Sequence, residues 1–171
     1  MKLELKHTFD EKTFRHALNG HGVVLHCHHY MSLTTKLAED FADLGAPRVL
    51  REATEDSIRP MLDSYIKEHG VASPEERLEV GRQYFAAMGM GTMEITGGAS
   101  GGTATLKHSH VDEGWLQKWG PHDKPINHFT CGFVAAAFAA AFDKPARSFQ
   151  VTESASMVMG APASVLAVKP A

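Results

Sequence analysis

Histidine is the residue type in this chain that points most directly to chemistry, with 11 residues among 171. Imidazole is the commonest metal ligand in proteins and the usual proton carrier near neutral pH. The densest cluster is the run His26, Cys27, His28, His29 and Tyr30. A second cluster, His108 and His110, places two histidines one residue apart. Metal or acid–base chemistry is therefore expected first at these two short segments.

The two clusters together offer enough nitrogen atoms for one metal ion. The candidate ligands are His26, His28, His108 and His110. Four imidazoles suit zinc or iron, and two histidines separated by one residue share a face if they lie on a strand. A metal with an open coordination position activates water or polarises a substrate. Cys27 and His29 would then be the candidate catalytic nucleophile and base of a metal-dependent enzyme.

A second hypothesis uses the aromatic residues and needs no metal. Trp115 and Trp119 lie four positions apart, so both face the same way on a helix. They either pack in the core or form the wall of an apolar ligand pocket. In such a pocket, Tyr30 and Trp115 would contact an apolar or aromatic ligand, while His29 and His110 would orient its polar groups. Histidines with only a structural or surface role are the remaining alternative.

Composition excludes several classes of protein. With 17 basic and 20 acidic residues the net charge is −3, so the positive charge of a dedicated nucleic-acid binder is missing. Two cysteines cannot form a disulfide scaffold. No segment approaches the ~18 apolar residues that cross a bilayer, and the N-terminus lacks the apolar stretch of a signal peptide. We therefore expect a cytoplasmic protein without a membrane partner.

Helices are predicted from the spacing of apolar residues and from capping signals. Apolar residues recur every three or four positions over 33–44. Ser73 before Pro74, with a glutamate three residues after the serine, has the features of a helix start. Asp10 is a candidate cap for a short helix that ends near Gly20. The predicted helices cover 10–20, 33–44, 47–66 with a break or kink at Pro60, 74–88 and 126–142, and residues 111–120 are predicted to form a short helix or a turn.

Strands are predicted at the N-terminus and in the second half of the chain. Alternating residues 3–5 are typical of an edge strand, and the glycine-rich segment 97–102 joins two strands into a hairpin. A second hairpin is predicted over 148–168, with its turn at 160–162. No linker or repeat divides residues 1–171. We therefore expect one α+β domain in which helices pack against an antiparallel sheet of about four strands.

The last third of the chain carries a family resemblance. Cys131-Gly132-Phe133-Val134-Ala135-Ala136 opens a small-residue helix, and residues 151–160 lead through a glycine turn into a second strand. This combination resembles the 4-vinyl reductase, or hydrocarbon-binding, domain family, most specifically over residues 126–168. That family is related in fold to the ligand domains of phenol sensors and to TRAPP subunits. The resemblance implies an α+β homodimer with an apolar cavity, in which His110 and Trp115 face the ligand.

The resemblance also implies what has changed in this chain. Phenol-sensor relatives hold a structural zinc ion at positions that match Cys131, Glu153, Ser156 and Ser164. Serine hydroxyls are poor zinc ligands beside a thiolate. We therefore expect a packed or hydrogen-bonded remnant instead of zinc at these positions.

Three functions remain open at this stage. The leading hypothesis is a small-molecule-binding domain with a sensory role. The others are the histidine-ligated zinc or iron enzyme and a structural or assembly subunit. No flavin, nicotinamide or iron–sulfur motif is visible, so we do not expect reductase activity from this chain alone.

Overall fold

The computed structural model describes residues 2–171, apart from the side chain of His28. The strands are β1 (His7–Asp10), β2 (Arg15–Leu18), β3 (His21–Val23), β4 (Gly91–Gly98), β5 (Gly101–Ser109), β6 (Phe149–Ala155) and β7 (Ser164–Pro170). The α-helices are α1 (His28–Asp40), α2 (Ala46–Glu68), α3 (Pro74–Ala87), α4 (His110–Trp119) and α5 (His128–Ala141). Two short 3-10 helices are η1 (Ala42–Leu44) and η2 (Met157–Met159).

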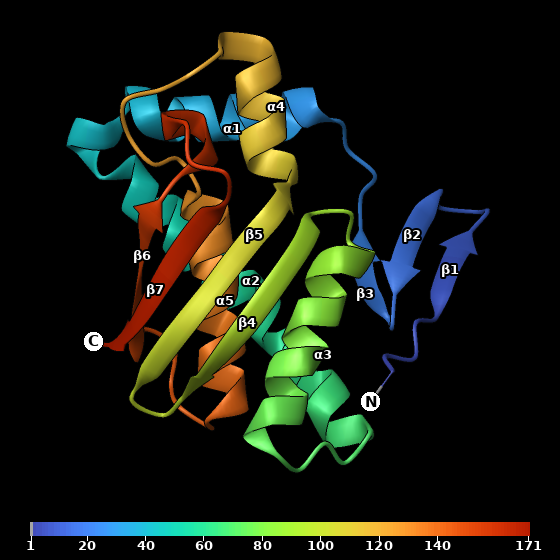
Figure 1. Cartoon of the computed structure of the whole chain (residues 1–171). Coiled ribbons are helices and arrows are strands. Elements are labelled where there is room, and N and C mark those ends of the chain that lie inside the picture. The colour runs from blue at the N-terminus through green and yellow to red at the C-terminus, as the bar shows by residue number, and fades with distance from the viewer. Residues whose placement is uncertain (1) are drawn as a thin grey trace.

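The larger sheet has four antiparallel strands in the order β4-β5-β7-β6. It is built from the two predicted hairpins, joined by pairing of β5 with β7. Helices α2 and α5 lie behind this sheet in Figure 1 and cover one of its faces. On β5, Ala104 and Leu106 are fully buried, whereas their neighbours are more exposed, as expected for a sheet with one covered face. The predicted α+β fold with a four-stranded antiparallel sheet is confirmed.

Helix α5 is the centre of the core. Thirteen of its 14 residues are buried, which explains why its sequence is almost entirely alanine, phenylalanine and other small or apolar residues. Gly132 allows α2 to approach closely, because a Cβ atom there would lie 2.2 Å from the carbonyl oxygen of Arg51. The Phe133 ring packs edge-on against Phe85 of α3, with ring centroids 5.1 Å apart. The small-residue helix is therefore a packing element between two other helices and the sheet.

The capping signals at the start of α3 behave as predicted. The Ser73 hydroxyl oxygen accepts a hydrogen bond from the backbone N–H of Glu76 at 3.2 Å and donates to the Glu76 carboxylate at 3.1 Å.

The predicted break at Pro60 does not occur, because α2 runs unbroken from Ala46 to Glu68. Pro60 is exposed, so the backbone hydrogen bond that it lacks lies on the solvent side of the helix.

The predicted helix between Asp10 and Gly20 is wrong. These residues instead contribute the end of β1 and all of β2 to the three-stranded antiparallel sheet β1-β2-β3, which projects from the body in Figure 1 and is called the arm below. Asp10 accepts hydrogen bonds from the Lys12 N–H at 2.9 Å and the Thr13 hydroxyl at 2.6 Å, so it stabilises a turn. Phe14 has a φ of 54°, which a right-handed helix does not accommodate.

Helices α1 and α4 pack against each other at one end of the larger sheet, at the top of Figure 1. Helix α4 follows β5 without a loop, and the Ser109 hydroxyl oxygen caps it by accepting from the Asp112 N–H at 3.1 Å. No helix among residues 2–171 combines the length and the apolar character that crossing a bilayer requires.

Candidate functional site

The two histidine clusters of the sequence meet where α1 and α4 begin. The ring of His26, just before α1, lies 5.3 Å from the ring of His110, the first residue of α4. The ring of Tyr30 also lies near His26, with ring centroids 5.7 Å apart. Two segments about 80 residues apart in the sequence are thus brought to one end of the molecule.

His108, the other predicted metal ligand near α4, does not join His26 and His110. His108 lies on β5 with a side chain that is 75% exposed, and its ring nitrogen is 3.6 Å from the carboxylate of Glu113. Among the side chains that the structure describes, no three from His, Cys, Asp or Glu are placed to hold a metal ion. The side chain of His28 lies outside the described part. The other three predicted ligands, His26, His108 and His110, therefore do not form a metal site by themselves.

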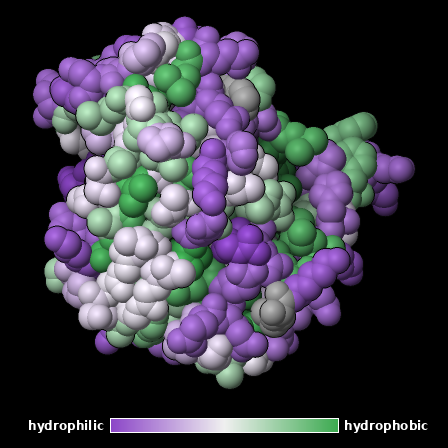
Figure 2. Space-filling model, viewed as in Figure 1, coloured by the Kyte–Doolittle hydropathy of each residue, from purple (hydrophilic) through white to green (hydrophobic). Residues whose placement is uncertain are grey.

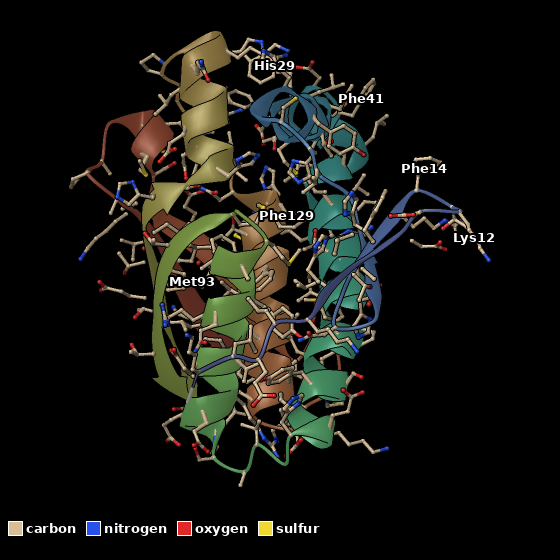
Figure 3. All side chains as sticks on the ribbon, turned by 90° about the vertical axis from the view of Figure 1, so that its right-hand side faces the viewer. Lys12, Phe14, His29, Phe41, Met93 and Phe129 are labelled. Carbon is tan, nitrogen blue, oxygen red and sulfur yellow. The ribbon has the colours of Figure 1, made fainter. Side chains whose placement is uncertain are left out.

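Cys27 and His29, the candidate nucleophile and base, both lie at the surface. Cys27 occupies the position just before α1, where the backbone N–H groups of Tyr30 and then His29 lower the pKa of its thiol. His29 is exposed on the first turn of the helix and lines a pocket between α1 and α4 (Figure 3). Cys27 is therefore an accessible thiol with raised reactivity.

Trp115 is the buried centre of this end of the molecule. Its side chain is 2% exposed, and its ring lies 4.8 Å from Trp119 and 4.9 Å from His122. Its indole N–H has no hydrogen-bond partner among the residues that the structure describes. Buried tryptophans usually satisfy this donor. Trp115 therefore offers one donor that the described residues leave without a partner.

A second unused polar atom lies on the neighbouring helix. Ser32 on α1 is 1% exposed, and its hydroxyl likewise makes no hydrogen bond within the described residues. A pocket of about 330 Å³ between the two helices is lined by His29, Ser32, Gly114, Gln117 and Lys118. Trp115 and His110 are not part of its lining. The pocket is thus lined by residues of α1, which carries Ser32, and of α4, which carries Trp115.

A chain of charged and polar side chains, which the sequence analysis missed, links His122 to the core. The Glu39 carboxylate on α1 is hydrogen-bonded to His128 Nε2 and lies 3.8 Å from His122 Nε2. Arg51 Nη2 is 3.0 Å from His128 Nδ1. Burial lowers the pKa of His128, although Glu39 opposes this. A neutral His128 accepts from Arg51 and donates to Glu39, which holds Glu39 beside His122.

Nothing in the sequence distinguished these residues. His122 and His128 are isolated histidines, and Glu39 is an ordinary acidic residue beside Asp40. Their only shared property is that the fold places them together, across sequence separations of about 80 to 90 residues.

Comparisons with known proteins give the fold but no sequence family. No family model matches the chain, and no curated protein matches its sequence. Among solved structures, the phenol-responsive sensory domain of the transcription activator PoxR, solved with phenol, is similar. Its TM-score is 0.78 at 16% identity, and the match covers 96% of this chain and 84% of that one. The chain has the fold of that domain.

Two further structures agree with this fold. A vinyl-4-reductase family protein from Methanocaldococcus jannaschii has a TM-score of 0.51 at 20% identity, covering 71% of this chain and 68% of that one. Subunit 3 of a trafficking protein particle complex from Naegleria fowleri, covalently bound to palmitic acid, has a TM-score of 0.50 at 11% identity. That match covers 81% of this chain and 95% of the other. The predicted resemblance to these three kinds of protein is confirmed at the level of fold.

Two of the four positions expected for the zinc remnant, Glu153 and Ser164, belong to a buried hydrogen-bond network. The Asn127 side-chain amide donates to Glu153 and to Asp112, each at 2.9 Å. The Ser164 hydroxyl donates to Asp112 at 3.1 Å and accepts from the backbone N–H of Met157 at 2.9 Å. Glu153 and Ser164 are thus already engaged, and Cys131 is the single thiol of the set. These residues do not fit a structural zinc ion.

Burial sets the protonation behaviour of this network. It raises the pKa of Asp112 and of Glu153, even though several donors favour their charged forms. It also raises the pKa of Cys131 to about 12, so this thiol stays protonated at neutral pH. The network is therefore a structural element and not a site of nucleophilic chemistry.

A larger hollow of about 550 Å³ lies between α2, α5 and β6. Its rim carries Arg48, paired with Glu52 at 3.1 Å, and Arg147, paired with Glu55 at 2.9 Å. These pairs neutralise the charges that a ligand would otherwise meet. The α1–α4 end, with its unused buried donors, is the better candidate site.

Proposed function

We propose that this chain is a small-molecule-binding domain that takes an aromatic or apolar ligand with one hydrogen-bonding group between α1 and α4. The observation that carries the proposal is the buried indole N–H of Trp115, which has no partner among the described residues. Leaving a buried donor unpaired costs ~1–3 kcal/mol, and a ligand oxygen would remove that cost.

The surroundings of Trp115 define the class of ligand. The rings of Trp119 and His122 lie within 5 Å of it and offer aromatic surface on which a planar molecule stacks. Ser32 supplies a second hydrogen-bonding group on the facing helix. His29, at the pocket, and His110, at the start of α4, are proposed to contact polar groups at the edge of the ligand. Tyr30, which is 61% exposed, lies at the outer rim.

The comparisons support the same function without deciding it. The phenol-responsive sensory domain of PoxR has this fold over nearly the whole chain. We infer that this chain likewise serves as a sensory domain, and that a phenol is a suitable first probe. Phenol combines an aromatic ring with one hydroxyl whose oxygen accepts from an indole N–H.

Isothermal titration calorimetry with phenol tests the proposal. We expect saturable binding at one site per chain, and weaker binding of toluene, which has the ring without the hydroxyl. Trp115→Phe keeps an aromatic ring but removes the N–H, so we expect it to weaken phenol binding about tenfold, the equivalent of ~1.4 kcal/mol.

Trp119→Phe is the matched control, because it makes the same substitution on the same helix, keeps an aromatic ring at position 119 and leaves the Trp115 N–H in place. It should leave the affinity for phenol within about twofold. Absence of saturable binding would reject phenols as the ligand class. Equal losses in the two variants would show that the Trp115 N–H has no special role.

A further inference from the structure

The pocket between α1 and α4 holds a positive charge that no described acidic residue neutralises. Among the described residues, its lining contains no aspartate and no glutamate, and consists of His29, Ser32, Gly114, Gln117 and Lys118. Lys118 has no carboxylate within ion-pair distance in the part of the chain that the structure describes. By contrast, Arg48 and Arg147 on the rim of the larger hollow are each paired with a glutamate. A ligand that enters the smaller pocket therefore meets an uncompensated cation.

The Lys118 ammonium lies next to the aromatic cluster of α4. Its Nζ atom is 5.0 Å from the centre of the Trp119 ring, and that ring lies 4.8 Å from the ring of Trp115. The face of an indole ring attracts a cation, which favours this position of the ammonium over more extended ones. The charge is thus held close to the aromatic surface on which we place the ring of the ligand.

Two further groups of the pocket donate hydrogen bonds. The Ser32 side chain is 1% exposed, and its hydroxyl has no partner among the described residues. The His29 ring also lines the pocket and carries at least one N–H in either protonation state. Carboxylate oxygens accept several hydrogen bonds at once, and bonds to a charged acceptor are about twice as strong as neutral ones. One cation and two donors around a single pocket are therefore suited to an anion.

The thiol of Cys27 already responds to the same positive charge. Cys27 directly precedes α1 and is exposed. The backbone N–H groups of Tyr30 and then His29 do most to lower the pKa of this thiol, and the Lys118 ammonium adds to the effect. The cation that lines the pocket thus stabilises one anion of the protein itself, the Cys27 thiolate.

The size and the polarity of the pocket limit what it binds. Figure 2 shows mostly hydrophilic residues over the end of the molecule that α1 and α4 form, at the top of the view, whereas hydrophobic residues gather around the arm, at the right. An ionised group keeps part of its hydration at such a surface, which lowers the cost of its entry. The volume of about 330 Å³ is at the lower end of the range for small-molecule sites, so it suits a molecule of one ring.

We propose that the ligand of this domain carries an anionic group, and that the pocket between α1 and α4 binds this group through Lys118, Ser32 and His29. This ligand class rests on the function proposed above, in which the Trp115 N–H donates to a hydroxyl of an aromatic ligand. A molecule with one aromatic ring, a hydroxyl and a carboxylate satisfies both requirements. The ligands are then hydroxylated aromatic acids, and Lys118 is the residue that separates them from neutral phenols.

Calorimetry with 3- and 4-hydroxybenzoate and with their amides tests the ligand class, because each acid differs from its amide in charge and hardly in shape. We expect at least one acid to bind about tenfold more tightly than its amide. Lys118→Gln should weaken binding of that acid about fivefold and change the affinity for the amide by less than twofold. Lys107→Gln removes the same charge from an exposed side chain of β5, so as the control it should leave the ratio of the two affinities unchanged.

Alkylation of Cys27 measures the same charge without any aromatic ligand. Iodoacetate is an anion and iodoacetamide is neutral, so the ratio of their rates at one thiol reports the local field, while the thiolate fraction cancels. Cys131 is buried and protonated and does not contribute. We expect Lys118→Gln to lower the iodoacetate-to-iodoacetamide ratio about twofold, and Lys107→Gln to leave it unchanged.

The outcomes separate the anionic ligand from the function on which it rests. Equal affinities of each acid and its amide, with phenol binding still dependent on Trp115, would overturn the anionic ligand and leave the proposed function standing. So would an acid whose advantage survives Lys118→Gln, or an alkylation ratio that this variant does not change. Binding of an acid through Lys118 that Trp115→Phe leaves intact would instead reject the proposed role of the indole N–H. If neither phenol nor the acids bind, both proposals fail.

Discussion

At the scale of single residues, the two cysteines show how position decides reactivity. Cys27 is exposed at the start of α1, where backbone N–H groups stabilise its thiolate and lower its pKa. Cys131 is 2% exposed in the middle of the core, where burial raises its pKa to about 12. The thiolate is the nucleophilic form, so the same side chain is reactive in one place and inert in the other.

This contrast predicts the result of a thiol titration. With Ellman's reagent at neutral pH, the native chain should react at one thiol, and Cys27→Ser should abolish that reaction. The second thiol should react only after unfolding in urea, because Cys131 is both protonated and inaccessible. Two equivalents from the native chain would show that the core around Cys131 opens readily.

At the scale of elements, the packing of α5 against α2 depends on the absence of a side chain at Gly132. A Cβ atom on Gly132 would lie 2.2 Å from a backbone oxygen of α2, which cannot move without shifting the helix. A Cβ atom on Gly81 of α3 would lie 3.0 Å from the Ala137 side chain, which is a milder contact. Gly132 and Gly81 both lie within helices, so they form a matched pair of sites at which to compare the effect of an added methyl group.

We expect Gly132→Ala to lower the free energy of unfolding by at least ~2 kcal/mol, because the helices must separate to admit the methyl group. Gly81→Ala should cost less, since alanine's helix propensity offsets part of the overlap by up to ~1 kcal/mol. Urea denaturation of both variants measures the difference. A Gly132→Ala variant as stable as Gly81→Ala would mean that α2 and α5 are not in close contact.

At the scale of the whole molecule, the Asn127 network ties α4, α5, β6 and β7 together and makes stability depend on pH. Burial raises the pKa of Asp112 and Glu153 above their ordinary values of 3.8 and 4.5. The folded chain thus binds these protons more tightly than the unfolded chain. Their contribution to stability is fully present below the ordinary values and is lost as the pH rises through the folded-state values.

Comparing the wild type with Glu153→Gln isolates this effect. Between about pH 4 and pH 7, the wild type should lose unfolding free energy relative to the variant as the pH rises, whatever their absolute difference in stability. Urea denaturation at several pH values gives the two slopes, and Glu113→Gln, which removes an exposed carboxylate, corrects for the change in net charge. Parallel slopes would mean that Glu153 titrates as it does in the unfolded chain.

The sequence by itself determined those helices, turns and caps whose formation depends on residues nearby in the chain. The Ser73 cap, the glycine-rich hairpin and the small-residue helix depend on neighbours within a few residues, and each formed where it was predicted. The Asp10–Gly20 helix failed for a related reason, because an aspartate that starts a helix also stabilises a turn. The α+β class and the antiparallel sheet of about four strands followed from combining these elements with a family resemblance, whereas the strand order came from the structure.

Only the tertiary structure decided the site. The unused Trp115 donor and the Glu39–His122–His128 chain depend on contacts between segments that lie far apart in the sequence. His26 and His110 lie close together, but His108 does not join them, because β5 ends at Ser109 and His110 begins helix α4, so His108 and His110 no longer share the face of one strand. The helical spacing of residues 33–44 is the same whether that face is buried or open. Its exposure is a property of the assembled surface, because burial depends on which other elements the fold brings against it.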